Sequence, residues 1–377
     1  MNEDKINNVA GKDVKVYNRI KLIFSILETF LIMLFLLVLI FTGLSKDIAT
    51  FSYQFSSNVY VALIIFILFL LIIQSIISFP FSFYSGYCVE HKYSLSNQTF
   101  FRWMWEEIKS SLISIVLSVP LLLLMLYILK NYENNWWVWF GIIIFLFSVV
   151  IAKITPTFIL PLFYKFKPIN DEAIVERLNA LCGKENISTK GIFSFNLSKE
   201  TKKANAFFTG IGKSKSINLS DTLLEQFSID EIETVFAHEL GHNRHKHLWK
   251  GMIFNTVVLF LGLYIVSVIF SDLVAHFGYS SISDIAAFPL IFLLLSIYGF
   301  IFLPVTNLVS RHHEKEADCY AVKLTDNYTA FESTMLKLAD LNLSDKEPNR
   351  FVEIFFYGHP SINNRIKFIK GKMGIND

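Results

Sequence analysis

The sequence predicts a mainly α-helical, polytopic membrane protein with about six transmembrane helices and a small α+β domain inserted between the fourth and fifth of them. Of the 377 residues, 53% are hydrophobic and only 18% are charged. The mean hydropathy is +0.46, which exceeds what the core of a soluble domain of this length requires. The excess lies in blocks of about 20 apolar residues, each long enough to cross about 30 Å of hydrocarbon. These observations exclude a soluble enzyme, a disulfide-rich secreted scaffold and a disordered protein.

Six apolar segments are predicted to span the membrane. They are residues 22–44, 59–80, 111–130, 136–160, 252–271 and 287–309. Basic residues concentrate in the N-terminal tail and in the 161–251 segment, whereas the 271–286 loop has no Lys or Arg. The positive-inside rule therefore predicts that both termini and the 161–251 segment lie on the cytoplasmic side of a bacterial inner membrane or of the endoplasmic reticulum.

The 161–251 segment has the pattern of a small α+β unit. Residues 171–182 have helical periodicity, and three short β-prone runs follow at 191–196, 206–209 and 216–219. Ser228 with Glu231 three residues later is typical of a capping box that opens a helix. We expect that helix to continue through Leu248 into the fifth span.

An HExxH motif lies on this helix, at residues 238–242. The i, i+4 spacing places His238 and His242 on one face, where both imidazoles can bind one zinc ion. Glu239 is adjacent to the first of them and can reach a water molecule as a general base. Gly241 strengthens the interpretation, because a glycine inside a helix is costly unless another segment approaches closely. The alternative is a solvated helix face with incidental histidines.

A catalytic zinc needs a third protein ligand and one open position. The candidates in the sequence are His245, His247, His312, His313, Glu314, Glu316, Asp318 and His359. His245 is disfavoured because three ligands in line along one helix cannot surround a tetrahedral ion. Glu314 and Asp318 lie one turn apart just after the sixth span, so one can bind zinc while the other orients a ligand or protonates a leaving group. A solvated, charged helix face is the alternative for this pair.

The position of these residues along the chain adds a functional indication. His242 precedes the fifth span by about 15 Å of helix, and Glu314 follows the sixth by about 7 Å. A zinc site there lies at the membrane interface, where water and lipid-borne substrates are both available. We therefore divide the chain into residues 1–160 with spans 1–4, a zinc-protease insert at 161–251, spans 5–6 at 252–309, and a C-terminal segment at 310–377 that completes the zinc site.

At these residues the chain resembles the integral-membrane CaaX prenyl protease family, type I, whose members are zinc metallopeptidases. The resemblance extends in order from about residue 20 to the C-terminus. The motifs that carry it are residues 80–84, 89–92, 97–99, 161–166, 205–210, 221–225, 238–242, 310–318 and 359–365. One difference is the number of spans. Six are predicted here, whereas the family usually has seven around a water-filled chamber.

The resemblance implies a complete set of site residues. Its zinc ligands are His238, His242 and Glu314, its general base is Glu239, and Asp318 is an acid or an orienting residue. Asn205 then belongs to an edge strand that pairs with substrate backbone, while His359 and Arg365 stabilise the oxyanion. The implied substrate is a C-terminal CaaX-type tail with a prenylated cysteine, presented at the membrane lipid and cleaved just after that cysteine.

Three other functions remain open from the sequence. The main alternative is a quality-control protease of the HtpX kind, which shares the zinc machinery. A site-2-type intramembrane protease is disfavoured because HExxH precedes a span instead of lying inside one. A catalytically idle membrane scaffold or transporter would bind no zinc tightly. Nucleic acid is not expected as a partner, because the net charge is +2 and no run of basic and aromatic residues occurs.

Overall fold

The computed structural model describes residues 3–185, 191–209 and 216–375. Six helices in these residues are long and apolar enough to cross a membrane, which confirms the predicted class. They are α1 (Glu3–Phe41), α3 (Val59–Phe81), α5 (Phe100–Asn131), α6 (Trp136–Ile154), α11 (His247–His276) and α12 (Phe288–Thr325). Each of these helices has large apolar side chains that are more than half exposed, among them Phe30, Ile72, Val116, Leu146, Val257 and Ile301. This pattern suits lipid contact.

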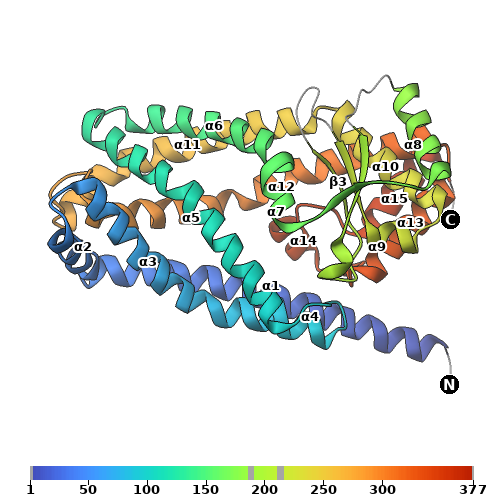
Figure 1. The fold of residues 1–377 in the computed structure, drawn as a ribbon, viewed down its shortest axis with the longest axis horizontal. Coiled ribbons are helices and arrows are strands. Elements are labelled where there is room, and N and C mark those ends of the chain that lie inside the picture. Colours follow the sequence, from blue (N-terminus) through green and yellow to red (C-terminus); the bar gives the residue numbers. More distant parts are fainter. Residues whose placement is uncertain (1–2, 186–190, 210–215, 376–377) are drawn as a thin grey trace.

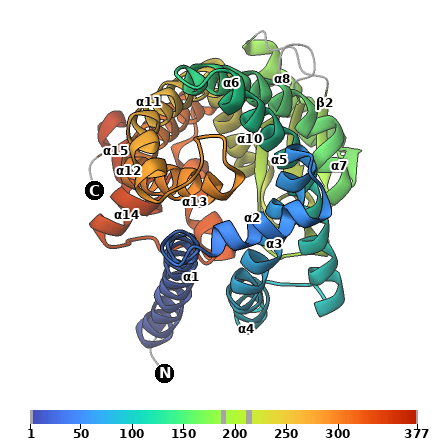
Figure 2. The same cartoon turned by 90° about the vertical axis from the view of Figure 1, so that its left-hand side faces the viewer.

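The six long helices form a closed ring when the molecule is viewed along its long axis (Figure 2). In ring order, α1 contacts α3, then α5, α6, α11 and α12 follow, and α12 contacts α1 again. Gly262 on α11 leaves room for the ring of Tyr298 on α12, because a Cβ built there would overlap that ring. The chain thus closes a helical ring with six candidate spans in the residues described.

The other elements are shorter, and most lie at one end of the ring. The remaining α-helices are α2 (Leu44–Phe55), α4 (Val89–Lys92), α7 (Leu160–Phe163), α8 (Glu172–Lys184), α9 (Asp221–Gln226), α10 (Ile229–Arg244), α13 (Tyr328–Leu341), α14 (Arg350–Phe356) and α15 (Ile362–Met373). Two π-helical turns, Ser82–Cys88 and Thr155–Ile159, end α3 and α6. Helices α8, α10, α13 and α15, the sheet and both chain ends lie together at the right of Figure 1.

A four-stranded sheet has the order β1-β2-β4-β3. Its strands are β1 (Phe166–Pro168), β2 (Gly191–Phe195), β3 (Ala206–Thr209) and β4 (Ser216–Ser220). Strands β2 and β4 are parallel, and the other two pairs are antiparallel. The three predicted β runs are therefore confirmed, whereas β1 has only three residues and no visible pattern. Gly210, at the end of the 205–210 motif, lies outside the described residues.

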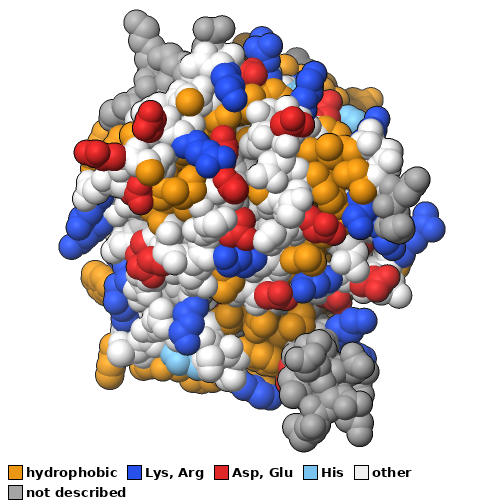
Figure 3. Space-filling model, turned by 90° about the vertical axis from the view of Figure 1, so that its right-hand side faces the viewer, with side chains coloured by type: hydrophobic (Ala, Val, Ile, Leu, Met, Phe, Trp, Pro, Cys, Tyr) orange, Lys and Arg blue, Asp and Glu red, His pale blue; other side chains and the backbone are white. Residues whose placement is uncertain are grey.

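The end of the molecule that carries the sheet has a different surface from the helical ring. Figure 3 shows Lys and Arg side chains interspersed with Asp and Glu across this face, with apolar side chains in small groups between them. A surface of mixed charge is typical of a part that lies in water.

The helix with the HExxH motif begins as predicted but ends earlier. The Ser228–Glu231 capping box is present at the start of α10. The expected continuous helix through Leu248 is wrong, because α10 ends at Arg244 and α11 begins at His247. Lys246 between them has φ 56°, a left-handed conformation that a right-handed helix cannot contain. The break lets α11 enter the ring in a new direction while α10 stays beside the sheet.

Helices α10 and α12 pack very closely at Gly241. A Cβ built on Gly241 would lie 3.0 Å from Cα of Ala317 and 3.2 Å from its carbonyl oxygen. Both contacts are to backbone, which cannot move aside as a flexible side chain can. The glycine that the sequence singled out is therefore explained by close approach of a neighbouring helix.

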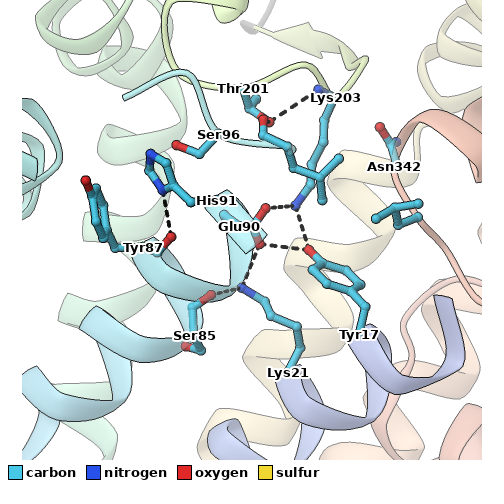
Figure 4. Close-up of polar contacts among 12 residues, drawn as sticks. Tyr17, Lys21, Ser85, Tyr87, Glu90, His91, Ser96, Thr201, Lys203 and Asn342 are labelled. Atoms are coloured by element: carbon cyan, nitrogen blue, oxygen red, sulfur yellow. Dashed lines mark hydrogen bonds and ion pairs between the residues drawn. The ribbon is translucent and has the colours of Figure 1, made fainter. Parts of the chain in front are cut away.

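A buried ionic cluster connects the ring to the end that carries the sheet (Figure 4). Glu90 accepts hydrogen bonds from the hydroxyl of Tyr17 at 2.7 Å and from Nζ of Lys21 at 3.0 Å. Its other oxygen lies 2.9 Å from Nζ of Lys203, in the segment before β3. One carboxylate thus joins α1, α4 and the approach to the edge strand.

Substitution of Glu90 by Gln should destabilise the protein by roughly 2 kcal/mol, because two partly buried ammonium groups lose their anion. We expect a lower midpoint of thermal unfolding in detergent. Glu133→Gln is the control, since Glu133 is exposed in the loop between α5 and α6. Equal midpoints for the two variants would contradict a stabilising role for the cluster.

Substitution of Gly241 by Ala should destabilise by about 1–3 kcal/mol, because the added methyl group pushes α10 away from α12. Gly251→Ala, inside α11, is the matched control, since a Cβ there meets nothing within 4 Å. That variant should keep or gain up to about 1 kcal/mol of stability. The prediction fails if both variants unfold at the wild-type temperature.

Candidate metal centre

Three side chains from two helices converge on one point. Nε2 of His238 and Nε2 of His242 on α10 are 3.1 Å apart. The carboxylate of Glu314 on α12 lies 3.5 Å from the first and 3.4 Å from the second. A tetrahedral zinc ion with bonds of about 2.0–2.2 Å separates its ligand atoms by roughly 3.3–3.6 Å. The spacing and the donor set of two imidazoles and one carboxylate therefore fit a single metal ion.

The sequence left eight candidates for the third ligand, and the fold brings Glu314 to the HExxH pair. His245 and His247 lie beyond the end of α10 and converge on Glu316 of α12, away from the HExxH pair. His312 is exposed, and His313 stacks on the ring of His247 with centroids 4.2 Å apart. Asp318 contacts His238 and His359 contacts Glu314, so each lies next to the three converging residues without being one of them.

Asp318 lies behind His238. Its Oδ1 is 3.0 Å from Nδ1 of His238, and the residue is fully buried. Arg365 on α15 donates to both oxygens of this carboxylate, at 2.8 and 2.5 Å. Burial by itself lowers the pKa of Arg365, but the Asp318 carboxylate outweighs it and raises that pKa, so the guanidinium stays charged. This arrangement orients His238 with Nε2 toward the metal position.

Glu239 occupies the position expected of a base. Its Oε2 accepts the backbone N–H of Phe208 at 3.0 Å. Burial raises the pKa of this carboxyl above its ordinary value, in spite of the two nearby imidazoles. A carboxylate with a raised pKa beside a metal position is suited to accept a proton near neutral pH.

Strand β3 is the free edge of the sheet and runs beside the motif. Asn205 and the alternate residues after it direct their backbone groups toward β4, as the Ser220 N–H bond to the Asn205 carbonyl shows. The backbone of Ala206 and Phe208 therefore faces the opposite way, toward α10. Sequence reasoning identified Asn205 but missed the Phe208 N–H, because the face of a strand depends on its register.

His359 approaches from the C-terminal segment. Its Nδ1 lies 3.0 Å from Glu314, and 70% of its side chain is exposed. Arg311 holds this segment in place, because its guanidinium donates to the carbonyl oxygens of Glu353, Ile354 and Tyr357. The sequence showed Arg311 only as part of the 310–318 motif, since nothing local indicates carbonyl partners so distant in the chain.

The converging residues open onto a cavity of about 1090 Å³. Seven of the eight predicted site residues line it: Asn205, His238, Glu239, His242, Glu314, His359 and Arg365. Asp318 is not among the lining residues, and its contacts are with His238 and Arg365 behind the cavity wall.

Comparison with known proteins agrees with this geometry. Residues 168–373 match the model of peptidase family M48, and residues 3–165 match the model described as CAAX prenyl protease N-terminal, five membrane helices. Four of the six candidate spans lie within this second match.

Among the similar proteins, "Uncharacterized metalloprotease YhfN" of Bacillus subtilis is 31% identical, over 88% of this chain and 78% of its own length. "CAAX prenyl protease 1" of Saccharomyces cerevisiae is 30% identical, over 78% and 69%. The crystal structure of S. mikatae Ste24p superposes with a TM-score of 0.86 at 27% identity, over 97% of this chain and 90% of that one. The resemblance found in the sequence is thus confirmed: the chain belongs to peptidase family M48 and is a multi-pass membrane metalloendopeptidase of the CAAX prenyl protease type.

Proposed function

We propose that this chain uses zinc to cleave CaaX-type tails that carry a prenylated cysteine, with His238, His242 and Glu314 as ligands. One observation carries the proposal: the three converging ligands open onto a cavity that also contains a free strand edge and membrane-proximal apolar side chains. Leu248 and Trp249, at the start of the spanning helix α11, line the cavity and are both exposed. An extended peptide and an attached apolar chain therefore reach the same space. The relatives named CAAX prenyl protease 1 support this substrate class.

The chain's own residues supply most of the mechanism. When bound, zinc acts as a Lewis acid that polarises the scissile carbonyl. The outward backbone of Ala206 and the carbonyl of Phe208 pair with the extended substrate, while the N–H of Phe208 stays on Glu239. Asn205 contacts the substrate just before β3. Glu239 takes a proton from the attacking water and later delivers it to the leaving amine.

The remaining site residues hold this arrangement and stabilise charge. The exposed His359 stabilises the oxyanion from the open side of the cavity. Arg365 lines the cavity as well, but its two bonds to Asp318 make its main role the orientation of His238. Asp318 has no path to a leaving group, so we assign it to orientation and not to acid catalysis.

We also propose that the active site faces the cytoplasm. The sheet and both chain ends lie at the same end of the ring (Figure 1), and these are the segments in which basic residues concentrate. The division at residues 160, 251 and 309 belongs to the same proposal. The first segment holds spans 1–4, and the last brings Glu314, Asp318, His359 and Arg365 to the motif.

A second candidate is quality-control proteolysis of membrane proteins, as in HtpX-like proteases. The similarity to a bacterial metalloprotease over 88% of the chain favours keeping it. A strand edge recognises the backbone of a peptide and not its side chains, so it can bind many different peptides. The two functions differ in whether the lipid is required.

Glu239→Gln should lower cleavage of a quenched fluorescent, farnesylated CaaX peptide by about 10²–10⁴-fold, because the base is lost. Gln retains an oxygen for the Phe208 N–H, so the fold and the zinc content should stay at wild-type levels. Zinc is measured by mass spectrometry of the purified protein. A variant that cleaves at the wild-type rate would exclude Glu239 as the base.

The same peptide without its farnesyl group distinguishes the two candidates. We expect wild-type protein to cleave the farnesylated form much faster, since the lipid supplies binding energy. Equal rates for the two peptides would support quality-control proteolysis, and Glu239→Gln would still abolish both.

Asp318→Asn should weaken zinc binding by about 10–100-fold, because the side chain keeps its shape but loses the charge behind His238. Competition with a chromophoric chelator measures this change. Asp345→Asn is a control, since Asp345 lines the cavity but contacts none of the proposed ligands. Unchanged affinity in Asp318→Asn would refute the orienting role.

A further inference from the structure

A second group of metal-ligating side chains lies next to the proposed catalytic centre. It consists of His245 at the end of α10, His247 at the start of α11 and Glu316 on α12, and their ligand atoms lie within 4.8 Å of one another. The left-handed Lys246 between the two histidines creates this group. In an uninterrupted helix, residues two apart point about 200° apart, so His245 and His247 could not both face Glu316.

We propose that His245, His247 and Glu316 form a second metal site that binds a borderline divalent ion such as Zn²⁺ and that reduces peptidase activity when it is filled. Two imidazole nitrogens and a carboxylate oxygen are ligands that zinc accepts. His247 is only 5% exposed, whereas the Glu316 side chain is 30% exposed. The site is therefore sheltered on one side and open to ions on the other.

The neighbouring side chains indicate that this second site has no open coordination position and binds zinc more weakly than the catalytic centre. His312, whose Nε2 lies 3.7 Å from Glu316, can supply a fourth ligand, and a four-ligand site has no open position for catalysis. Lys250 competes for the same carboxylate, with Nζ 3.6 Å from it. Because half of the Lys250 side chain is exposed, an ion can displace it. We expect this site to fill only at higher zinc concentration than the catalytic centre.

The effect on activity follows from the position of His247. Its Nδ1 lies 3.0 Å from Nδ1 of the proposed ligand His242, and its Nε2 lies 3.0 Å from Glu316. The Glu316 contact fixes the ring that supports His242. An ion bound to Nε2 of His247 leaves the proton of that ring on Nδ1, where it opposes the Nδ1–H that His242 carries as a metal ligand. The hydrogen bond between the two rings is then lost, and His242 is held less well in place. This step rests on the proposed function, whereas the existence of the second site does not.

Zinc counting on the full-length protein in detergent tests the site. The protein is equilibrated at buffered free Zn²⁺ from about 1 nM to 100 μM, and bound zinc is measured by mass spectrometry. Wild type should bind one equivalent and then a second. His245→Ala should bind only the first, and His276→Ala, an exposed histidine at the far end of α11, should bind both. His238→Ala should lose the tight equivalent and keep the weak one.

The outcomes separate this inference from the proposed function. A single equivalent in wild type, or two in His245→Ala with an unchanged unfolding temperature, overturns the second site. Retention of the tight equivalent in His238→Ala would instead count against the catalytic assignment. In the peptidase assay, zinc that fills the second site should slow wild type at least about fivefold and spare His245→Ala. Equal inhibition of both proteins overturns the regulatory part.

Discussion

The geometry of the metal centre depends on the contact between α10 and α12 at Gly241 and Ala317. The two HExxH imidazoles lie on α10 and Glu314 lies on α12, so the carboxylate can lie 3.4–3.5 Å from both imidazoles only because the two backbones nearly touch. A side chain at position 241 would separate the helices by more than a zinc–ligand bond tolerates. The close packing of the two helices, more than any single hydrogen bond, therefore determines where the proposed metal ligands lie.

Buried charge is the second feature on which the site depends. Glu314 and Asp318 are both buried within one turn of α12. Two carboxylates so close together are stable only with positive partners. Arg365 from the C-terminal segment supplies one permanent charge, and a metal ion held by the imidazoles and Glu314, as proposed above, would supply the other. The last part of the chain thus completes a site whose motif lies more than a hundred residues earlier.

The site is also fixed relative to the membrane. Glu90 joins the first spanning helix and the end of the second to the segment that leads into β3. The free strand edge therefore has a defined position with respect to the ring of spanning helices. For the lipid-attached substrate proposed above, this fixed distance would decide which peptide bond reaches the metal centre.

Local patterns in the sequence were enough to predict several features of this protein. Apolar length predicted six spans, the i, i+4 spacing predicted the imidazole pair, and capping chemistry predicted where α10 begins. Contacts between distant segments could not be predicted in this way, because they depend on how the whole chain packs. Spacing could not separate Glu314 from the other ligand candidates, and no local signal predicted the left-handed Lys246 or the outward N–H of Phe208. These features depend on how α10, α11, α12 and the sheet pack together, and packing is a property of segments that are far apart in the chain.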